Sequence, residues 1–296
     1  MNNNYYSETF NPENENMNMN GSPKPKKHSF VKFFVTIIIV GIILIVTGAI
    51  WFDKTKEKYA EEKESFTKNF DCINIDNLDF STGVGRIYVK STDDNVITVE
   101  ATDVPKDYYK FSTKGNTFSI DTTNESTQKH IVNLMNSDDY FKNTKLTIYI
   151  PKGEYEYLKV NSGVGETYIN EINCKRADLQ QGVGLCRYEN LTVNDNTKLD
   201  CGVGETYFKN CTLEDTDIGC GIGMLDFNAE LNGNLKVDGG IGDAYIDING
   251  SYSNYVIDNH DNNIQISKGD NVETDSDKHY KIDVDKGIGS IKLKFR

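Results

Sequence analysis

The longest apolar stretch of the chain lies near its N-terminus, at residues 30–52, and reads FVKFFVTIIIVGIILIVTGAIWF. From Phe33 to Phe52 it carries no charge, and twenty residues of α-helix are enough to cross a bilayer core of about 30 Å. The run is too long for the apolar part of a cleaved signal peptide, and no small-x-small cleavage site follows it. The pattern therefore predicts one transmembrane helix over residues 30–52, with the lipid bilayer as its partner.

The segments on either side of this run are polar. Residues 1–29 lack apolar periodicity and predict a disordered tail. Residues 53–69 mix Lys with Asp and Glu and predict a short charged stalk, helical because Glu64 and Lys68 are four positions apart. Lysines flank the run on both sides, and the short basic tail favours a cytoplasmic N-terminus. We therefore expect a single-pass protein of the cell membrane whose C-terminal domain is extracytoplasmic.

Beyond residue 70 the apolar pattern changes to period-two alternation around a repeated Gly-[Val/Ile]-Gly motif. The motif begins at Gly83, Gly163, Gly182, Gly202, Gly221, Gly240 and Gly287. The middle five copies are 19 or 20 residues apart, a spacing that suits one coil of a β-solenoid and is too short for helical-pair repeats. The predicted fold class is all-β, a parallel β-solenoid with about 19–20 residues per coil.

Alignment of the coils on the glycines gives columns of constant character. The residues three before the motif, and two and four after it, are mostly apolar, so we expect them inside the stack. The motif itself is expected to be a corner, where the glycines permit tight or positive-φ backbone and the central Val or Ile is a buried plug. The column four before the motif alternates in charge: Lys159, Asp178, Lys198, Asp217 and Lys236. Parallel strands about 4.8 Å apart would place these opposite charges side by side.

The remaining segments are expected to complete this stack. Residues 70–150 contain several strand-like runs and predict an N-terminal β region that caps the solenoid. Residues 151–296 predict the coils, with an irregular segment at about 249–281 where the motif is missing. The final run, YKIDVDKGIGSIKLKFR, predicts a last coil whose lysines blunt an exposed edge strand.

Composition excludes several classes of function. The formal net charge of -13 argues against a nucleic-acid-binding surface. Six cysteines without a CxxC pair, and four scattered histidines, favour buried thiols over a zinc site, and we expect no cofactor. The stretch GGIGDAYID at 239–247 is similar to a calcium-binding β-roll repeat, but Asp243 stands one place early and the other coils have no matching Asp.

Two columns are candidates for chemistry. Glu166, Glu205 and Asp243 directly follow the motif, but Leu185 and Met224 interrupt them, so a row of catalytic carboxylates is not expected. The column three after the motif contains Tyr88, Tyr168, Arg187, Tyr207, Asp226, Tyr245 and Lys292. It has two interpretations. It could be an aromatic ladder that stabilises the sheet, or a binding face for a sugar or protein that uses Tyr168, Arg187, Tyr207 and Tyr245.

Gly-[Val/Ile]-Gly coils behind one apolar span resemble the "putative adhesin" family of bacterial, single-span, membrane-anchored β-solenoid proteins, common in Gram-positive species. Lia-type accessory proteins of envelope-stress systems are included. The resemblance covers about residues 70–296 and carries no catalytic residues over. It implies a non-enzymatic cell-envelope protein that binds a wall or protein partner. The alternatives are an envelope-stress regulatory accessory protein and a cell-wall carbohydrate-active enzyme.

Overall fold

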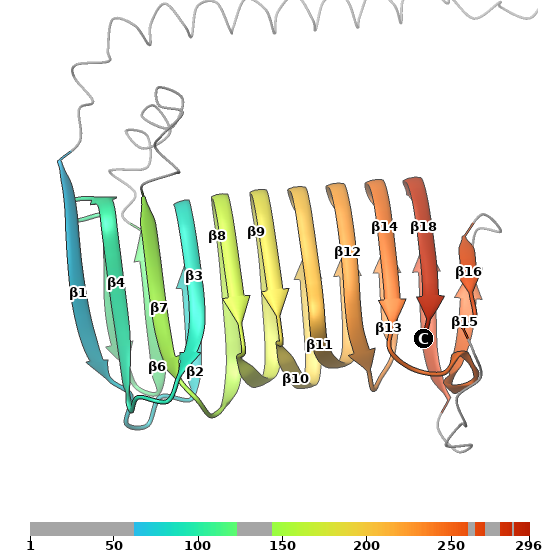
Figure 1. Ribbon diagram of the computed structural model, residues 1–296, viewed down its shortest axis with the longest axis horizontal. Helices are drawn as coiled ribbons and strands as arrows, with labels where there is room; N and C mark the ends of the chain where they lie inside the picture. Colours follow the sequence, from blue (N-terminus) through green and yellow to red (C-terminus); the bar gives the residue numbers. More distant parts are fainter. Residues whose placement is uncertain (1–61, 123–143, 260–263, 270–278, 286) are drawn as a thin grey trace, which may run out of the picture. The chain divides into compact units, whose positions relative to one another are not determined.

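The computed structural model describes residues 62–122, 144–259, 264–269, 279–285 and 287–296 (Figure 1). All of them belong to one compact unit, Lys56–Arg296. The predicted tail, the apolar run and the first part of the stalk lie outside the described residues. Within the described ranges, no helix is long and apolar enough to cross a membrane.

The described residues form one sheet of 18 strands. The N-terminal strands are β1 (Lys63–Asp71), β2 (Asn77–Ser81), β3 (Val84–Thr92), β4 (Val96–Pro105), β5 (Tyr109–Lys114), β6 (Thr117–Thr122) and β7 (Lys145–Pro151). The middle strands are β8 (Glu154–Asn170), β9 (Asn173–Glu189), β10 (Thr192–Asp200), β11 (Val203–Gly219), β12 (Ile222–Leu231), β13 (Leu235–Asp238) and β14 (Ile241–Ile248). A 3-10 turn, η2 (Tyr252–Asn254), precedes β15 (Tyr255–Asn259), β16 (Gln265–Ser267), β17 (Tyr280–Asp285) and β18 (Ile288–Phe295).

The strands are arranged in two rows of hydrogen-bonded neighbours (Figure 1). One row runs β1, β4, β7, β3, β8, β9, β11, β12, β14, β18 and β16. The other runs β5, β6, β2, β8, β9, β10, β11, β13, β17 and β15. Strands β8 and β9 belong to both rows because they continue through the glycine motif, and β11 belongs to both because it continues through the bend near Asn210. Every pairing from β8 onward is parallel, which confirms an all-β fold of mostly parallel strands.

The interior between the rows is filled by the columns that the alignment predicted. From one row come the residues three before the motif, among them Leu179, Leu199, Ile218 and Val237. From the other come the residues four after it, among them Tyr188, Phe208, Phe227 and Ile246. All of these side chains are at most 2% exposed. Neighbouring rings are in contact, with centroids 4.7 Å apart for Tyr188–Phe208 and 5.3 Å for Phe208–Phe227, so the core is continuous from coil to coil.

The glycines of the motif are required by close approach of the coils. A Cβ on either glycine of the copies from Gly163 onward would lie 1.7–2.1 Å from a glycine carbonyl oxygen of the preceding coil. The second glycine of each copy also has φ between +132° and +143°, which side chains disfavour. The expectation that the motif needs tight or positive-φ backbone is therefore confirmed.

The expectation of a buried plug at the centre of the motif is wrong. The central residues Val183, Val203, Ile222, Ile241 and Ile288 are 44–72% exposed. Only at the N-terminal end is the residue buried, at Val84. The reason is a break in the alternation. Val160 and Thr167 both belong to interior columns although they are seven residues apart, an odd number. The alternation of inward and outward side chains must therefore shift by one residue between them. The shift occurs before the central residue of the motif, which therefore points outward.

The charged stalk is also corrected over residues 63–69, which are not helical. They form most of β1, which pairs antiparallel with β4. Phe66 and Phe70 alternate with polar residues and contact Phe111, with ring centroids 5.9 and 5.5 Å apart. Packing of these two rings selects a strand over the helix that the charge spacing favoured.

The segment at about 249–281 is less irregular than expected. Its described parts contain η2, β15 and β16, and these two strands pair with β17 and β18. The coil β17–β18 therefore lies between β13–β14 and β15–β16, although it comes last in the chain. The lysine-rich β18 is flanked by β14 and, along three residues, by β16, so the expectation that it forms the edge is wrong.

Replacement of Gly204 by Ala should destabilise the protein more than replacement of Gly85. Both glycines have similar φ values, +137° and +143°. An Ala Cβ would lie 1.9 Å from the Gly184 carbonyl oxygen at Gly204, but 3.5 Å from its nearest neighbour, the Tyr109 hydroxyl, at Gly85. Strain alone costs about 1–3 kcal/mol, and each kcal/mol lowers the melting temperature by about 2–4 °C in a unit of this size. Thermal melts of the purified chain should show the larger loss for Gly204→Ala. Equal losses would mean that backbone φ, not contact between coils, requires the glycines.

The corrected orientation also predicts different costs for a carboxylate at two valines. Val203→Asp should change stability by no more than about 1 kcal/mol because the side chain is exposed. Val237→Asp should cost several kcal/mol because Val237 is fully buried and no cation would pair with the carboxylate. Denaturant titration of both variants measures the difference. A severe loss of stability for Val203→Asp would mean that the central residue of the motif is buried, as the sequence predicted.

Candidate binding face

The predicted tyrosine column lies in register on the outer side of one row of strands. Tyr88 pairs with Tyr168, Tyr168 with Arg187, and Arg187 with Tyr207. The column continues through Asp226 to Tyr245 and Lys292. The predicted adjacency of Tyr168, Arg187 and Tyr207 is therefore confirmed.

The side chains of this column stack on one another. The rings of Tyr88 and Tyr168 are 4.8 Å apart and within 4° of parallel. The Arg187 guanidinium lies 4.7 Å from the Tyr207 ring centroid, and the Lys292 ammonium lies 5.0 Å from that of Tyr245. Such contacts contribute about 0.5–1 kcal/mol each at exposed sites. Because neighbours cover these ring faces, the geometry favours a stabilising ladder over a surface on which sugars stack.

The carboxylates directly after the motif have local partners. Glu166 forms an ion pair with Arg86 at 2.8 Å. Glu205 accepts a hydrogen bond from the Tyr207 hydroxyl at 2.8 Å, which raises the pKa of that tyrosine. Asp243 accepts bonds from the Ser290 hydroxyl at 2.6 Å and its amide at 3.1 Å, which lower the pKa of Asp243. In the parts of the chain that the structure describes, no group of three or more His, Cys, Asp or Glu could hold a metal ion.

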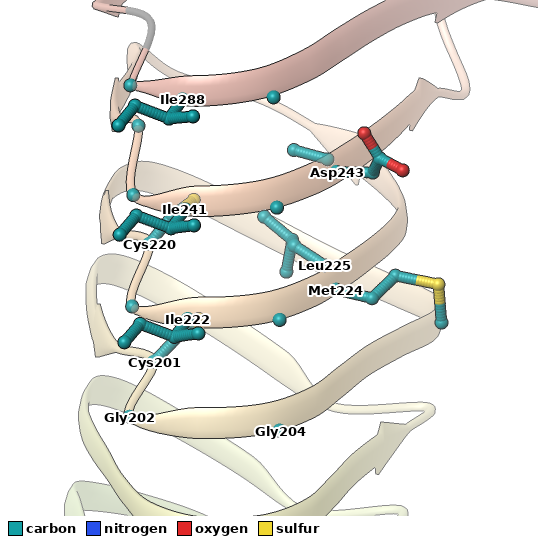
Figure 2. Close-up of a pocket in the computed structure, with 18 of the residues that line it drawn as sticks. Cys201, Gly202, Gly204, Cys220, Ile222, Met224, Leu225, Ile241, Asp243 and Ile288 are labelled. Atoms are coloured by element: carbon teal, nitrogen blue, oxygen red, sulfur yellow. The ribbon is translucent and has the colours of Figure 1, made fainter. Parts of the chain in front are cut away.

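A second outer column was missed by sequence reasoning. We name it the aliphatic ridge and define it as Val183, Val203, Ile222, Ile241 and Ile288. These residues pair in consecutive coils and are each at least 44% exposed. Figure 2 shows three members of the ridge, Ile222, Ile241 and Ile288, between the two columns of glycines, where they line a pocket together with Cys201 and Cys220. The odd spacing between the interior columns shows that the alternation shifts by one residue near the motif, but not on which side of the central residue.

Cys201 and Cys220, in neighbouring coils, line this pocket and pack against the core. Cys201 and Cys220 are partly buried, whereas Cys174, Cys186 and Cys211 are fully buried, and all are free thiols. Burial raises the pKa of Cys201 to about 12 and that of Cys220 to about 11. These thiols therefore stay protonated at neutral pH, in a form that is a poor nucleophile.

The geometry defines a class of fold: a stack of parallel coils that contact one another through two columns of glycines. The family model described as Toastrack DUF4097 matches residues 75–295, and the chain belongs to this family.

Similar solved structures include three crystal structures. A "putative cell adhesion protein" from Clostridium sporogenes ATCC 15579 is 13% identical, covers 79% of this chain and all of its own, and has a TM-score of 0.37. A "putative adhesin" from Bacteroides fragilis NCTC 9343 is 16% identical over 79% and 98% of the two chains, with a TM-score of 0.38. Another from Parabacteroides distasonis ATCC 8503 is 13% identical over 80% and 98%, with a TM-score of 0.35. The comparison with curated proteins found no match.

The buried thiols predict a loss of stability at alkaline pH. An unfolded thiol loses its proton near pH 8.5, whereas folded Cys201 does so at about pH 12. Between these values the folded state binds more protons, so the free energy of unfolding falls as pH rises, by up to about 1.4 kcal/mol per pH unit for each such thiol. Melting temperatures measured from pH 8 to 9.5 should fall less steeply for Cys201→Ala than for the unchanged protein. Equal slopes would mean that the Cys201 thiol titrates as freely in the folded chain as in the unfolded one.

Proposed function

We propose that this chain is a non-enzymatic, membrane-anchored protein of the cell envelope. Residues 30–52 span the cell membrane, and the toastrack unit lies outside it, where it binds a wall or protein partner. The uncharged run from Phe33 to Phe52 supports the anchor. The short basic tail supports a cytoplasmic N-terminus.

The observation that carries the binding role is the repeated outer face. Consecutive coils repeat the aliphatic ridge on the same outer face as the column of Tyr168, Arg187, Tyr207 and Tyr245. Exposed apolar side chains in an unbroken line are typical of interaction surfaces. A carbohydrate-active enzyme has less support, because Glu166, Glu205 and Asp243 are each engaged by a neighbouring side chain.

Protease treatment of intact protoplasts tests the location. Protease should remove residues 70–296, because the unit is on the outer side of the membrane. An impermeant cross-linker applied to intact cells should join the chain to a wall or protein component through this unit. A cytoplasmic marker protein should survive the protease and remain unlinked.

The opposite results would overturn the proposal. Full protection of residues 70–296 in protoplasts whose other surface proteins are digested would place the unit in the cytoplasm. Release of soluble sugars from isolated cell walls by the purified chain would indicate an enzyme.

A further inference from the structure

The aliphatic ridge has the form of a docking surface. Each of its side chains stands between two glycines, so a strip of backbone without side chains lies on either side of the ridge (Figure 2). The outward face of these strands is open to solvent, and Ile288 is 72% exposed. β-branched pairs stabilise a sheet, but threonine would serve that purpose on an exposed face without leaving apolar surface in water. An uninterrupted exposed aliphatic line is more typical of a surface that binds.

The backbone beneath the ridge is already hydrogen-bonded. The amides of Ile222, Ile241 and Ile288 donate to the carbonyl oxygens of Gly202, Gly221 and Gly240, each at 2.8 Å. A partner therefore cannot add to this face as a β-strand. It has to be recognised by side chains that enter the two glycine strips.

The charges in the two outer columns that flank the ridge have one sign. Two positions before the motif, the outer column contains Gln180, Asp200, Gly219, Asp238 and Asp285. Directly after the motif, the outer column contains Leu185, Glu205, Met224, Asp243 and Ser290. These flanks hold five carboxylates and no cation. Lys198 and Lys236 pair with Asp200 and Asp238 at 3.8 and 2.7 Å, but these lysines lie in the next outer column, farther from the ridge.

This charge pattern indicates which kind of partner could bind the aliphatic ridge. A second copy of the chain would bring its own acidic flanks against these, so like charges would meet on both sides of the ridge. A partner with aliphatic side chains and adjacent cations would satisfy both the ridge and its flanks. We propose that the aliphatic ridge binds a protein partner through a basic segment in which aliphatic residues alternate with Lys or Arg. This inference rests on the proposed binding function and adds the chemistry of the partner.

A model peptide tests this inference. The probe is a fluorescent 12-residue peptide of alternating Leu and Lys, and its control replaces every Leu by Ser at the same charge. Fluorescence anisotropy with the purified full-length chain in an uncharged detergent should show at least tenfold tighter binding of the Leu–Lys peptide. Added salt should weaken this binding, because exposed charges are screened.

Substitutions locate the site. The double variant Ile222→Ser with Ile241→Ser should weaken binding of the Leu–Lys peptide at least tenfold. Val256→Ser is the matched control: Val256 is 57% exposed but lies on β15, in the other row of strands, so its loss should change nothing. Glu205→Gln with Asp243→Asn should weaken binding severalfold and reduce its salt dependence. Unchanged melting temperatures verify that the variants fold.

Three outcomes would overturn the inference. Equal binding of the Ser–Lys peptide would show attraction to an acidic chain without any role for the ridge. Unchanged affinity of the Ile222 and Ile241 double variant would place the peptide elsewhere. A dimer that sediments as such and dissociates in the double variant would make the ridge a contact between copies. None of these results depends on which side of the membrane the unit lies, so they are distinguishable from failure of the protease experiment.

Discussion

The close contact between glycine backbones of successive coils is the constraint on which this structure depends. Both glycine columns approach the preceding coil so closely that a single methyl group would meet a carbonyl oxygen. The contact fixes the spacing of the coils at one corner, and hydrogen bonds along the stack fix it elsewhere. Because every coil is held at the same corner, equivalent residues fall into line on both sides of the sheet.

This alignment separates two tasks along each coil. The inward columns carry the stability of the stack, since they form a continuous core of aromatic and aliphatic side chains. The outward columns are free to vary without loss of the core, and they differ strongly in character. One column consists mainly of tyrosines and cations that stack on one another. Another outer column, the aliphatic ridge, is left in contact with water.

Much of the fold could be predicted from the sequence because it repeats. The spacing of the glycines predicts parallel coils, and the interior columns and the order of Tyr168, Arg187 and Tyr207 follow from the same alignment. The orientation of Val203 could not be predicted by alternation alone, because alternation counted from either side of the motif gives opposite answers. The strand at Phe66 and Phe70 depends on contacts with Phe111, which is distant in sequence. The order of the last coils is equally non-local, since no motif marks β15 and β16.

The position of the coil β17–β18 has a consequence for how the chain acquires its structure. Strands β15 and β16 are made earlier than β17 and β18, yet the pairings that hold them in the sheet are with those later strands. Until β18 is available, β14 also lacks its neighbour on that side. The native stack therefore cannot be completed beyond β14 by strands that precede β17 in the chain. Native pairing beyond β14 requires β17 and β18, so a nascent chain that lacks them leaves β14 without its native neighbour on that side.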